Sequence, residues 1–144
     1  MPAIYHHARV VVAEDIDDLG HASNLAYIRW TLDAASAHSD AQGWTAEAYR
    51  RAGIVFVVRR HEFRYLRPTK AGERIVVRTW VASVERFTST RRYAIEREGS
   101  GEKLVSGATE WALVDLTRGA PARIPPELQG AFEIVDDLRP GAGD

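Results

Sequence analysis

The sequence predicts an α+β fold in which one long central helix is wrapped by a curved antiparallel sheet of about five strands. Three observations support this prediction. A long helical pattern of apolar residues comes before a series of strand-like segments. Short turns rich in glycine and proline join those segments, and short connections imply antiparallel pairing. Several segments have about 12 residues, which is longer than an average strand and suits a strongly bent sheet.

The first part of the chain contains one strand pattern and two helical patterns. Residues 5–14 include three consecutive valines and indicate a strand. Ser23 is a suitable N-cap for a helix over residues 24–38, and apolar side chains cover most of that helix. The helix is therefore expected to be buried on most sides. Residues 45–52 are expected to form a shorter helix that ends at Gly53.

The second part of the chain has the period of strands. Four segments are rich in valine and aromatic residues, which favour strands. Gly99 and Gly101 are placed to form the hairpin turn between the last two segments. A short terminal helix is expected to begin at Pro125 and Pro126. The four strand segments are residues 54–66, 74–87, 89–98 and 103–116.

Length and composition are typical of one globular domain. The chain has 144 residues, of which 45% are hydrophobic and 27% are charged. We expect a single domain over residues 1–137 and a flexible tail over residues 138–144. The formal net charge of −1 gives no general attraction to nucleic acid or to membranes. The sequence has no cysteine, no signal-peptide pattern and no apolar run of membrane length, so we expect a cytoplasmic protein without thiolate metal sites.

The segment from Asp17 to Trp30 combines a carboxylate, a tight turn and a helix N-terminus. Asp17 lies three residues before Gly20, and the predicted helix begins a few residues later. Free backbone N–H groups at a helix N-terminus favour negative charge that develops nearby. Acyl-transfer chemistry at a carbonyl needs a base or nucleophile beside such donors. The segment is therefore a candidate catalytic site, and its alternative interpretation is a purely structural loop.

Three parts of the chain follow the motifs of a known family. Residues 63–73 contain Tyr-x-x-Pro followed by Gly and an acidic residue, and residues 107–125 match the family's last hairpin. Over roughly residues 8–130 the chain resembles hotdog-fold acyl-CoA thioesterases of the 4-hydroxybenzoyl-CoA thioesterase type. The residues that match the family's N-terminal motif are Asp17, Gly20, Asn24, Tyr27 and Trp30.

The resemblance implies hydrolysis of an acyl-CoA thioester to a free acid and CoA. Asp17 is then either a nucleophile that forms a mixed anhydride or a general base that acts on water. Asp15 and Asp18 are rival carboxylates, whose alternative role is as solvated loop charges. Glu73 stands where the family more usually has Asp, and Asp33 lies near a position where relatives often have Glu.

Further residues of the segment are predicted to complete the site. The N–H groups of residues 24–26 are available if Ser23 caps the helix, and the resemblance points to that of Asn24 as the oxyanion donor. We predict Asn24 and His21 as catalytic residues beside the carboxylate, and Gly20 and Tyr27 as substrate-binding residues. The competing roles are helix capping for Asn24, turn formation for His21 and core packing for Tyr27.

The remaining candidates concern the CoA and acyl portions of the substrate. Arginine pairs well with phosphate, and three arginines flank a predicted turn between strands. These predicted phosphate contacts are Arg86, Arg91 and Arg92. Three aromatic residues either line an aromatic acyl pocket or fill the core, namely Trp44, Phe56 and Trp80.

Two other functions on the same fold remain open from the sequence. One is an enoyl-thioester hydratase or dehydratase, in which Asp17 would work with His21. The other is a non-catalytic module that binds acyl thioesters. The resemblance implies a homodimer or homotetramer with active sites at the shared interface. It also leaves open whether CoA or an acyl-carrier protein bears the thioester. We expect no cofactor other than the CoA of the substrate, and no metal.

Overall fold

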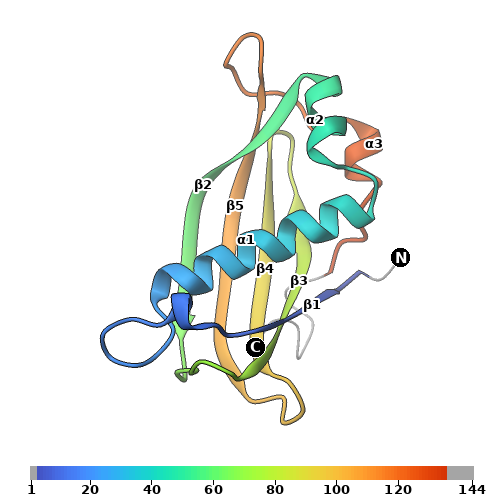
Figure 1. The fold of residues 1–144 in the computed structure, drawn as a ribbon. Helices are drawn as coiled ribbons and strands as arrows, with labels where there is room; N and C mark the ends of the chain where they lie inside the picture. Colours follow the sequence, from blue (N-terminus) through green and yellow to red (C-terminus); the bar gives the residue numbers. More distant parts are fainter. Residues whose placement is uncertain (1–2, 136–144) are drawn as a thin grey trace.

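A sheet of five antiparallel strands wraps around one long helix in the computed structural model, which describes residues 3–135 (Figure 1). The order of the strands across the sheet is β1-β3-β4-β5-β2. This arrangement confirms the α+β architecture predicted from the sequence. The strands are β1 (Tyr5–Val10), β2 (Ile54–Tyr65), β3 (Arg74–Val84), β4 (Thr88–Arg97) and β5 (Lys103–Asp115).

The long helix crosses the concave face of the sheet, and the two shorter helices lie near its C-terminal end (Figure 1). The starts of all three helices, and the ends of the first two, were predicted to within a few residues. The helices are α1 (Asn24–Ala41), α2 (Ala46–Ala52) and α3 (Pro126–Gln129). No helix in this described part of the chain has the length and apolar character needed to cross a membrane.

The first strand is shorter than predicted. It ends at Val10, and a 3₁₀ helix, η1 (Ala13–Asp15), follows where the sequence predicted continued strand. The Asp15 carboxylate accepts a hydrogen bond from the backbone N–H of Val12 at 3.0 Å. This bond closes a local turn and so competes with continued pairing in the sheet.

One face of α1 is buried against the sheet, and the other is exposed. Ser23 caps the helix as predicted, because its Oγ accepts the backbone N–H of Ala26 at 3.1 Å. The predicted burial on most sides is wrong for this chain alone, since Leu25 is 66% exposed. A helix that lies on a single sheet has only one face to bury. The buried residues of α1 are Ala26, Tyr27, Trp30, Thr31, Ala34, Ala35 and His38.

The core has separate clusters on the two faces of the sheet. The α1 side chains pack on inward-facing residues of β3, β4 and β5, including Ile75, Ile95 and Leu104. Trp80 is fully buried on the opposite face with Val135, so it fills the core. Trp44 and Phe56 belong to a cluster at the end of the molecule that holds α2 and α3. The predicted boundary at residue 137 and the predicted flexible tail lie outside the described residues.

The strand β2 forms a free edge of the sheet. It pairs with β5 on one side, and no strand of residues 3–135 pairs with its other side. The middle of β2 is solvent-exposed, and Val57 and Val58 are 41% and 39% exposed. A long free edge with exposed apolar side chains favours pairing with another strand.

Candidate active site

The predicted catalytic Asp17 lies in a tight turn just before α1. Its backbone N–H donates to the carbonyl oxygen of His21 at 2.8 Å, and its own carbonyl accepts the N–H of Gly20 at 3.0 Å. Gly20 has a φ of 83°, a left-handed conformation that favours glycine. The Asp17 Oδ1 accepts the N–H of Leu19 at 2.9 Å. The carboxylate is therefore solvent-exposed but held in a defined direction by its own loop.

The start of α1 offers two of the three predicted donors. The N–H of Ala26 is used by the Ser23 cap, so the predicted availability of this third donor is wrong. The N–H groups of Asn24 and Leu25 have no acceptor among residues 3–135. They are the orphan donors that a helix N-terminus leaves for a ligand or for water.

A small cavity of about 290 Å³ brings several of the predicted residues together. It joins the turn, the start of α1 and the segment that follows β2. Gly20 shapes the turn without lining this cavity. The residues at the end of β2 lie in a family motif, but they were not predicted as site residues from the sequence. The lining residues are Asp17, His21, Ala22, Asn24, Tyr27, Tyr65, Leu66, Arg67 and Pro68.

Tyr27 serves both the core and the cavity. Its ring packs edge-on against Trp30 with centroids 5.1 Å apart, and it lies 5.5 Å from the ring of Tyr65. Burial raises the pKa of the Tyr27 phenol, so the hydroxyl stays neutral at physiological pH. The two predicted roles of this residue are thus compatible.

The rival carboxylates occupy different environments. Asp15 is buried and bonded within η1, so its interpretation as a solvated loop charge is wrong. Asp18 is exposed and does not line the cavity. Asp17 is therefore the only one of the three that faces the start of α1 within the cavity.

The three predicted phosphate-binding arginines do not form one group. Arg86 is exposed in the β3–β4 turn, where its guanidinium carbon lies 5.3 Å from the centroid of Phe87. Arg92 and Arg91 are neighbours on β4 and so project to opposite faces of the sheet. Arg91 is only 6% exposed, so its predicted contact with a CoA phosphate would need a buried phosphate.

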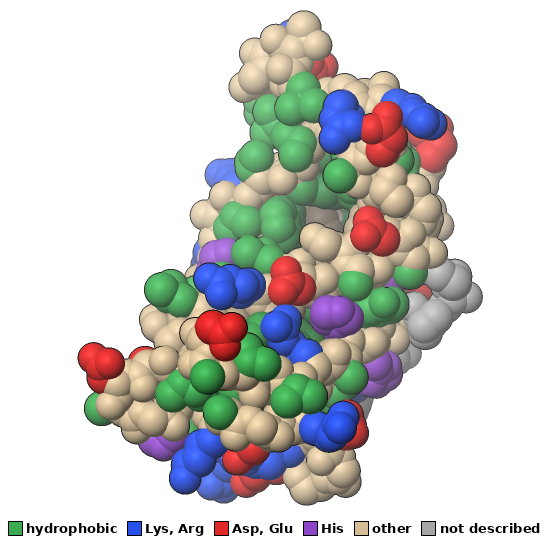
Figure 2. Space-filling view, in the orientation of Figure 1, with side chains coloured by type: hydrophobic (Ala, Val, Ile, Leu, Met, Phe, Trp, Pro, Cys, Tyr) green, Lys and Arg blue, Asp and Glu red, His purple; other side chains and the backbone are tan. Residues whose placement is uncertain are grey.

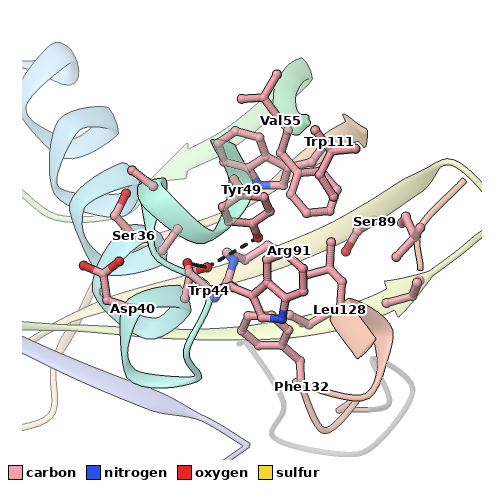
Figure 3. A pocket seen from close by; sticks show the side chains of 18 of the residues that line it. Ser36, Asp40, Trp44, Tyr49, Val55, Ser89, Arg91, Trp111, Leu128 and Phe132 are labelled. Carbon is pink, nitrogen blue, oxygen red and sulfur yellow. Dashed lines mark hydrogen bonds between the residues drawn. The ribbon is translucent and has the colours of Figure 1, made fainter. Parts of the chain in front are cut away.

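A larger cavity of about 620 Å³ lies between the C-terminal half of α1, α2, α3 and the sheet (Figure 3). Hydrophobic side chains gather at its mouth over one half of β2 (Figure 2). From the sequence, Trp44 and Phe56 were expected either to line a pocket or to fill the core, and both residues line this cavity. The other aromatic lining residues are Tyr49, Trp111 and Phe132. In the described range 3–135, no cluster of three His, Asp or Glu side chains is placed to hold a metal ion.

Comparisons with known proteins point to one family. The model of the Thioesterase-like superfamily matches residues 11–132. A 1,4-dihydroxy-2-naphthoyl-CoA thioesterase from Synechocystis has a TM-score of 0.83 at 16% identity, with 90% of this chain and 95% of that chain covered. A DHNA-CoA thioesterase from Staphylococcus aureus has a TM-score of 0.82 at 22% identity, with 89% and 87% covered.

A second Staphylococcus aureus protein, solved in complex with CoA, has a TM-score of 0.83 at 12% identity, with 89% of this chain and 80% of that chain covered. No curated protein matches this chain by sequence. The structural similarity confirms the predicted hotdog fold.

Proposed function

Because the chain belongs to the Thioesterase-like superfamily, we propose that it hydrolyses an acyl-CoA thioester to a free acid and CoA. One observation supports this proposal most directly. Asp17 and Asn24 line the same small cavity, and the backbone N–H of Asn24 has no acceptor within residues 3–135. A carboxylate and an unused helix N-terminal donor are the two groups that thioester cleavage requires.

The proposed chemistry has two routes that use the same residues. As a general base, Asp17 takes a proton from water, and the water oxygen bonds to the thioester carbon. As a nucleophile, the carboxylate oxygen makes that bond itself and gives a mixed anhydride, which water then hydrolyses. In both routes the C–S bond breaks, and the CoA thiolate leaves and takes up a proton. One oxyanion donor, here the N–H of Asn24, typically lowers the barrier by about 3–4 kcal/mol.

We assign the acyl group to the larger cavity, and the finer proposal is an aromatic acyl group. The five aromatic lining residues support this assignment, as does the sequence resemblance to the 4-hydroxybenzoyl-CoA type. The cavity volume of about 620 Å³ also lies in the range of small-molecule sites. Within one chain the two cavities are separated along α1. Asn24 lines the smaller cavity, and the first α1 residue that lines the larger one is Leu32, eight residues later. At 1.5 Å per residue this separation is about 12 Å.

A homodimer would bring the two cavities together. If the free edge of β2 pairs with β2 of a second copy about a two-fold axis that passes between Arg59 and Arg60, Ile54 lies opposite Tyr65 of the partner subunit. Ile54 lines the larger cavity and Tyr65 lines the smaller one. Asp17 would then act on a thioester whose acyl group occupies the cavity of the partner subunit. The exposed Val57 and Val58 on this edge support the proposed interface.

The catalytic proposal is tested with an Asp17→Asn variant. Wild-type protein is expected to release free thiol from at least one member of a panel of aromatic, short-chain and long-chain acyl-CoAs. The variant should lose about 10²- to 10⁴-fold in kcat, because it lacks the base or nucleophile. Asp18→Asn is the matched control, since it removes an adjacent exposed carboxylate outside the cavity. A fully active Asp17→Asn variant, or no hydrolysis across the panel, would contradict the proposal.

The same assays separate the alternatives. Both Asp17 and His21 line the small cavity, which is the observation that favours a hydratase. Hydration of crotonyl-CoA without thiol release would support that function. Binding of acyl-CoA without either reaction would support a non-catalytic module.

Sedimentation velocity tests the proposed dimer. The wild type is expected to sediment as a dimer, and Val58→Lys on the free edge of β2 is expected to shift it toward the 16.1 kDa monomer.

A further inference from the structure

The larger cavity contains a buried cation without an anionic partner in the described part of the chain. Arg91 is 6% exposed, and its Nη1 donates to Nδ1 of His38 at 2.9 Å and to Oγ1 of Thr79 at 3.1 Å. Burial and the neighbouring guanidinium lower the pKa of His38 to about 4, so this imidazole is neutral at pH 7. Both protein partners of the guanidinium are therefore uncharged.

Other arginines of the sheet show what is missing at this position. Arg78 on β3 is paired with Glu96 at 2.9 Å, and Arg97 at the end of β4 is paired with Glu73 and Glu102. Arg91 is more deeply buried than either of them and forms no ion pair with any residue in the range 3–135. Removing a guanidinium from water is costly unless an opposite charge compensates for it. A ligand anion would supply that compensation.

The guanidinium has an edge available for such a ligand. Its hydrogen bonds to the protein use Nη1 alone, and its Nε and Nη2 groups have no acceptor within residues 3–135. Figure 3 shows the Arg91 side chain among Trp44, Tyr49 and Phe132 in the cavity. The guanidinium carbon lies 5.6 Å from the centroid of Phe132. Paired N–H groups of arginine match the two oxygens of a carboxylate.

The rest of the cavity wall fits an apolar body. Aromatic and aliphatic side chains form most of the wall, and they come from the three helices, from the sheet and from the loops between them. The acidic lining residue, Asp40, is exposed on α1 and forms no ion pair with Arg91. The other basic lining residue, Arg50, is exposed and paired with Glu47. Arg91 therefore provides the buried charge of a largely apolar site.

We propose that Arg91 binds a carboxylate at the end of the acyl group farthest from the thioester. The substrate class is then an acyl group with a flat apolar body and a terminal carboxylate. This inference rests on the proposed function, because the thioester end must reach an Asp17 site. It changes the predicted role of Arg91 from a contact with CoA phosphate to the recognition of the acyl group.

Isothermal titration calorimetry tests the proposal without any turnover. The probes are 6-carboxy-2-naphthamide and 6-methyl-2-naphthamide, in which a stable amide replaces the thioester. Wild-type protein is expected to bind the carboxylate at least 10-fold more tightly than the methyl compound, because a charged hydrogen-bonded pair forms in a dry site. Equal binding of the two probes by the wild type would overturn the proposal.

Two Arg91 variants identify the residue responsible. Arg91→Gln should abolish the preference for the carboxylate, whereas Arg91→Lys should keep part of it because a cation remains. Arg74→Gln is the control, since Arg74 is exposed at the start of β3 and away from the cavity. Thermal unfolding of each unliganded variant shows whether it is folded. If a folded Arg91→Gln variant still binds the carboxylate more tightly than the methyl compound, the proposal is also overturned.

Failure of this inference is distinguishable from failure of the proposed function. Thioester hydrolysis with no carboxylate preference in calorimetry would leave the thioesterase proposal standing and refute the Arg91 site. An Arg91-dependent preference without hydrolysis of any acyl-CoA would support the binding site and refute the thioesterase proposal.

Discussion

His38 makes the stability of this fold sensitive to acid, and His38→Gln is the variant that tests this. The imidazole is 2% exposed and stacks on Tyr5, with ring centroids 5.2 Å apart. It also packs edge-on against Phe132 and accepts a hydrogen bond from Arg91. Protonation would place a second cation beside the guanidinium in a buried site. Burial, and then the charge of Arg91, therefore lower the pKa of His38 from 6.5 to about 4.

The sign and size of the effect follow from that pKa. Between pH 6.5 and pH 4 the unfolded chain binds a proton at His38 that the folded chain does not bind, so stability rises with pH. The contribution is fully present above pH 6.5 and is lost as the pH falls through this window. The full difference amounts to about 3 kcal/mol, of which about 2.5 kcal/mol has been lost at pH 4.5.

Urea unfolding at pH 7.0 and at pH 4.5 measures this contribution. His38→Gln keeps an acceptor for Arg91 but cannot titrate. The loss of unfolding free energy between the two pH values should therefore be about 2.5 kcal/mol smaller in the variant than in the wild type. Comparing the two proteins cancels the contributions of carboxylates that are common to both. His6→Gln, at an exposed histidine, is the control for removing one imidazole. Parallel losses in wild type and His38→Gln would refute the reasoning.

Two further variants test the packing that supports the site. Ser23→Ala removes the cap of α1 and should cost about 1 kcal/mol of unfolding free energy in urea, whereas Ser23→Asp should retain most of it. Gly107→Ala should cost about 1–3 kcal/mol in the same measurement, because the new Cβ would lie 2.6 Å from Cε1 of Phe63 and 3.0 Å from the carbonyl oxygen of Glu62. Phe63→Leu in the Gly107→Ala background should recover part of that loss, and no loss in the single variant would contradict the clash.

The elements could be predicted from the sequence where their signals are local. Ser23 and Thr45 accept the capping hydrogen bonds of α1 and α2, and Gly53 ends α2 with a φ of 74°. Each of these signals depends on a few adjacent residues. The turn around Gly20 was predictable for the same reason, and it carries Asp17 to the start of α1.

One error was local, because the end of β1 depends on the bond that the Asp15 carboxylate accepts from Val12, which strand periodicity does not report. The other errors arose where distant parts of the chain decide the outcome. The exposure of Leu25 depends on how much of α1 the sheet covers. The cavity beside Asp17 includes Tyr65 and Arg67, which come together with the turn only after β2 has paired with β5.

Arg91 shows why the chemistry of a site is harder to predict than its fold. On β4, strand alternation gives Arg91 and Arg92 different faces, but it does not indicate which face is covered. That depends on α1, which brings His38 over the sheet from 53 positions earlier in the sequence. Once His38 and Thr79 are identified as neutral partners, the missing negative charge becomes apparent. A charge that the fold buries without compensation is then better explained by a ligand than by stability, because an apolar residue of similar size would pack there without the desolvation cost.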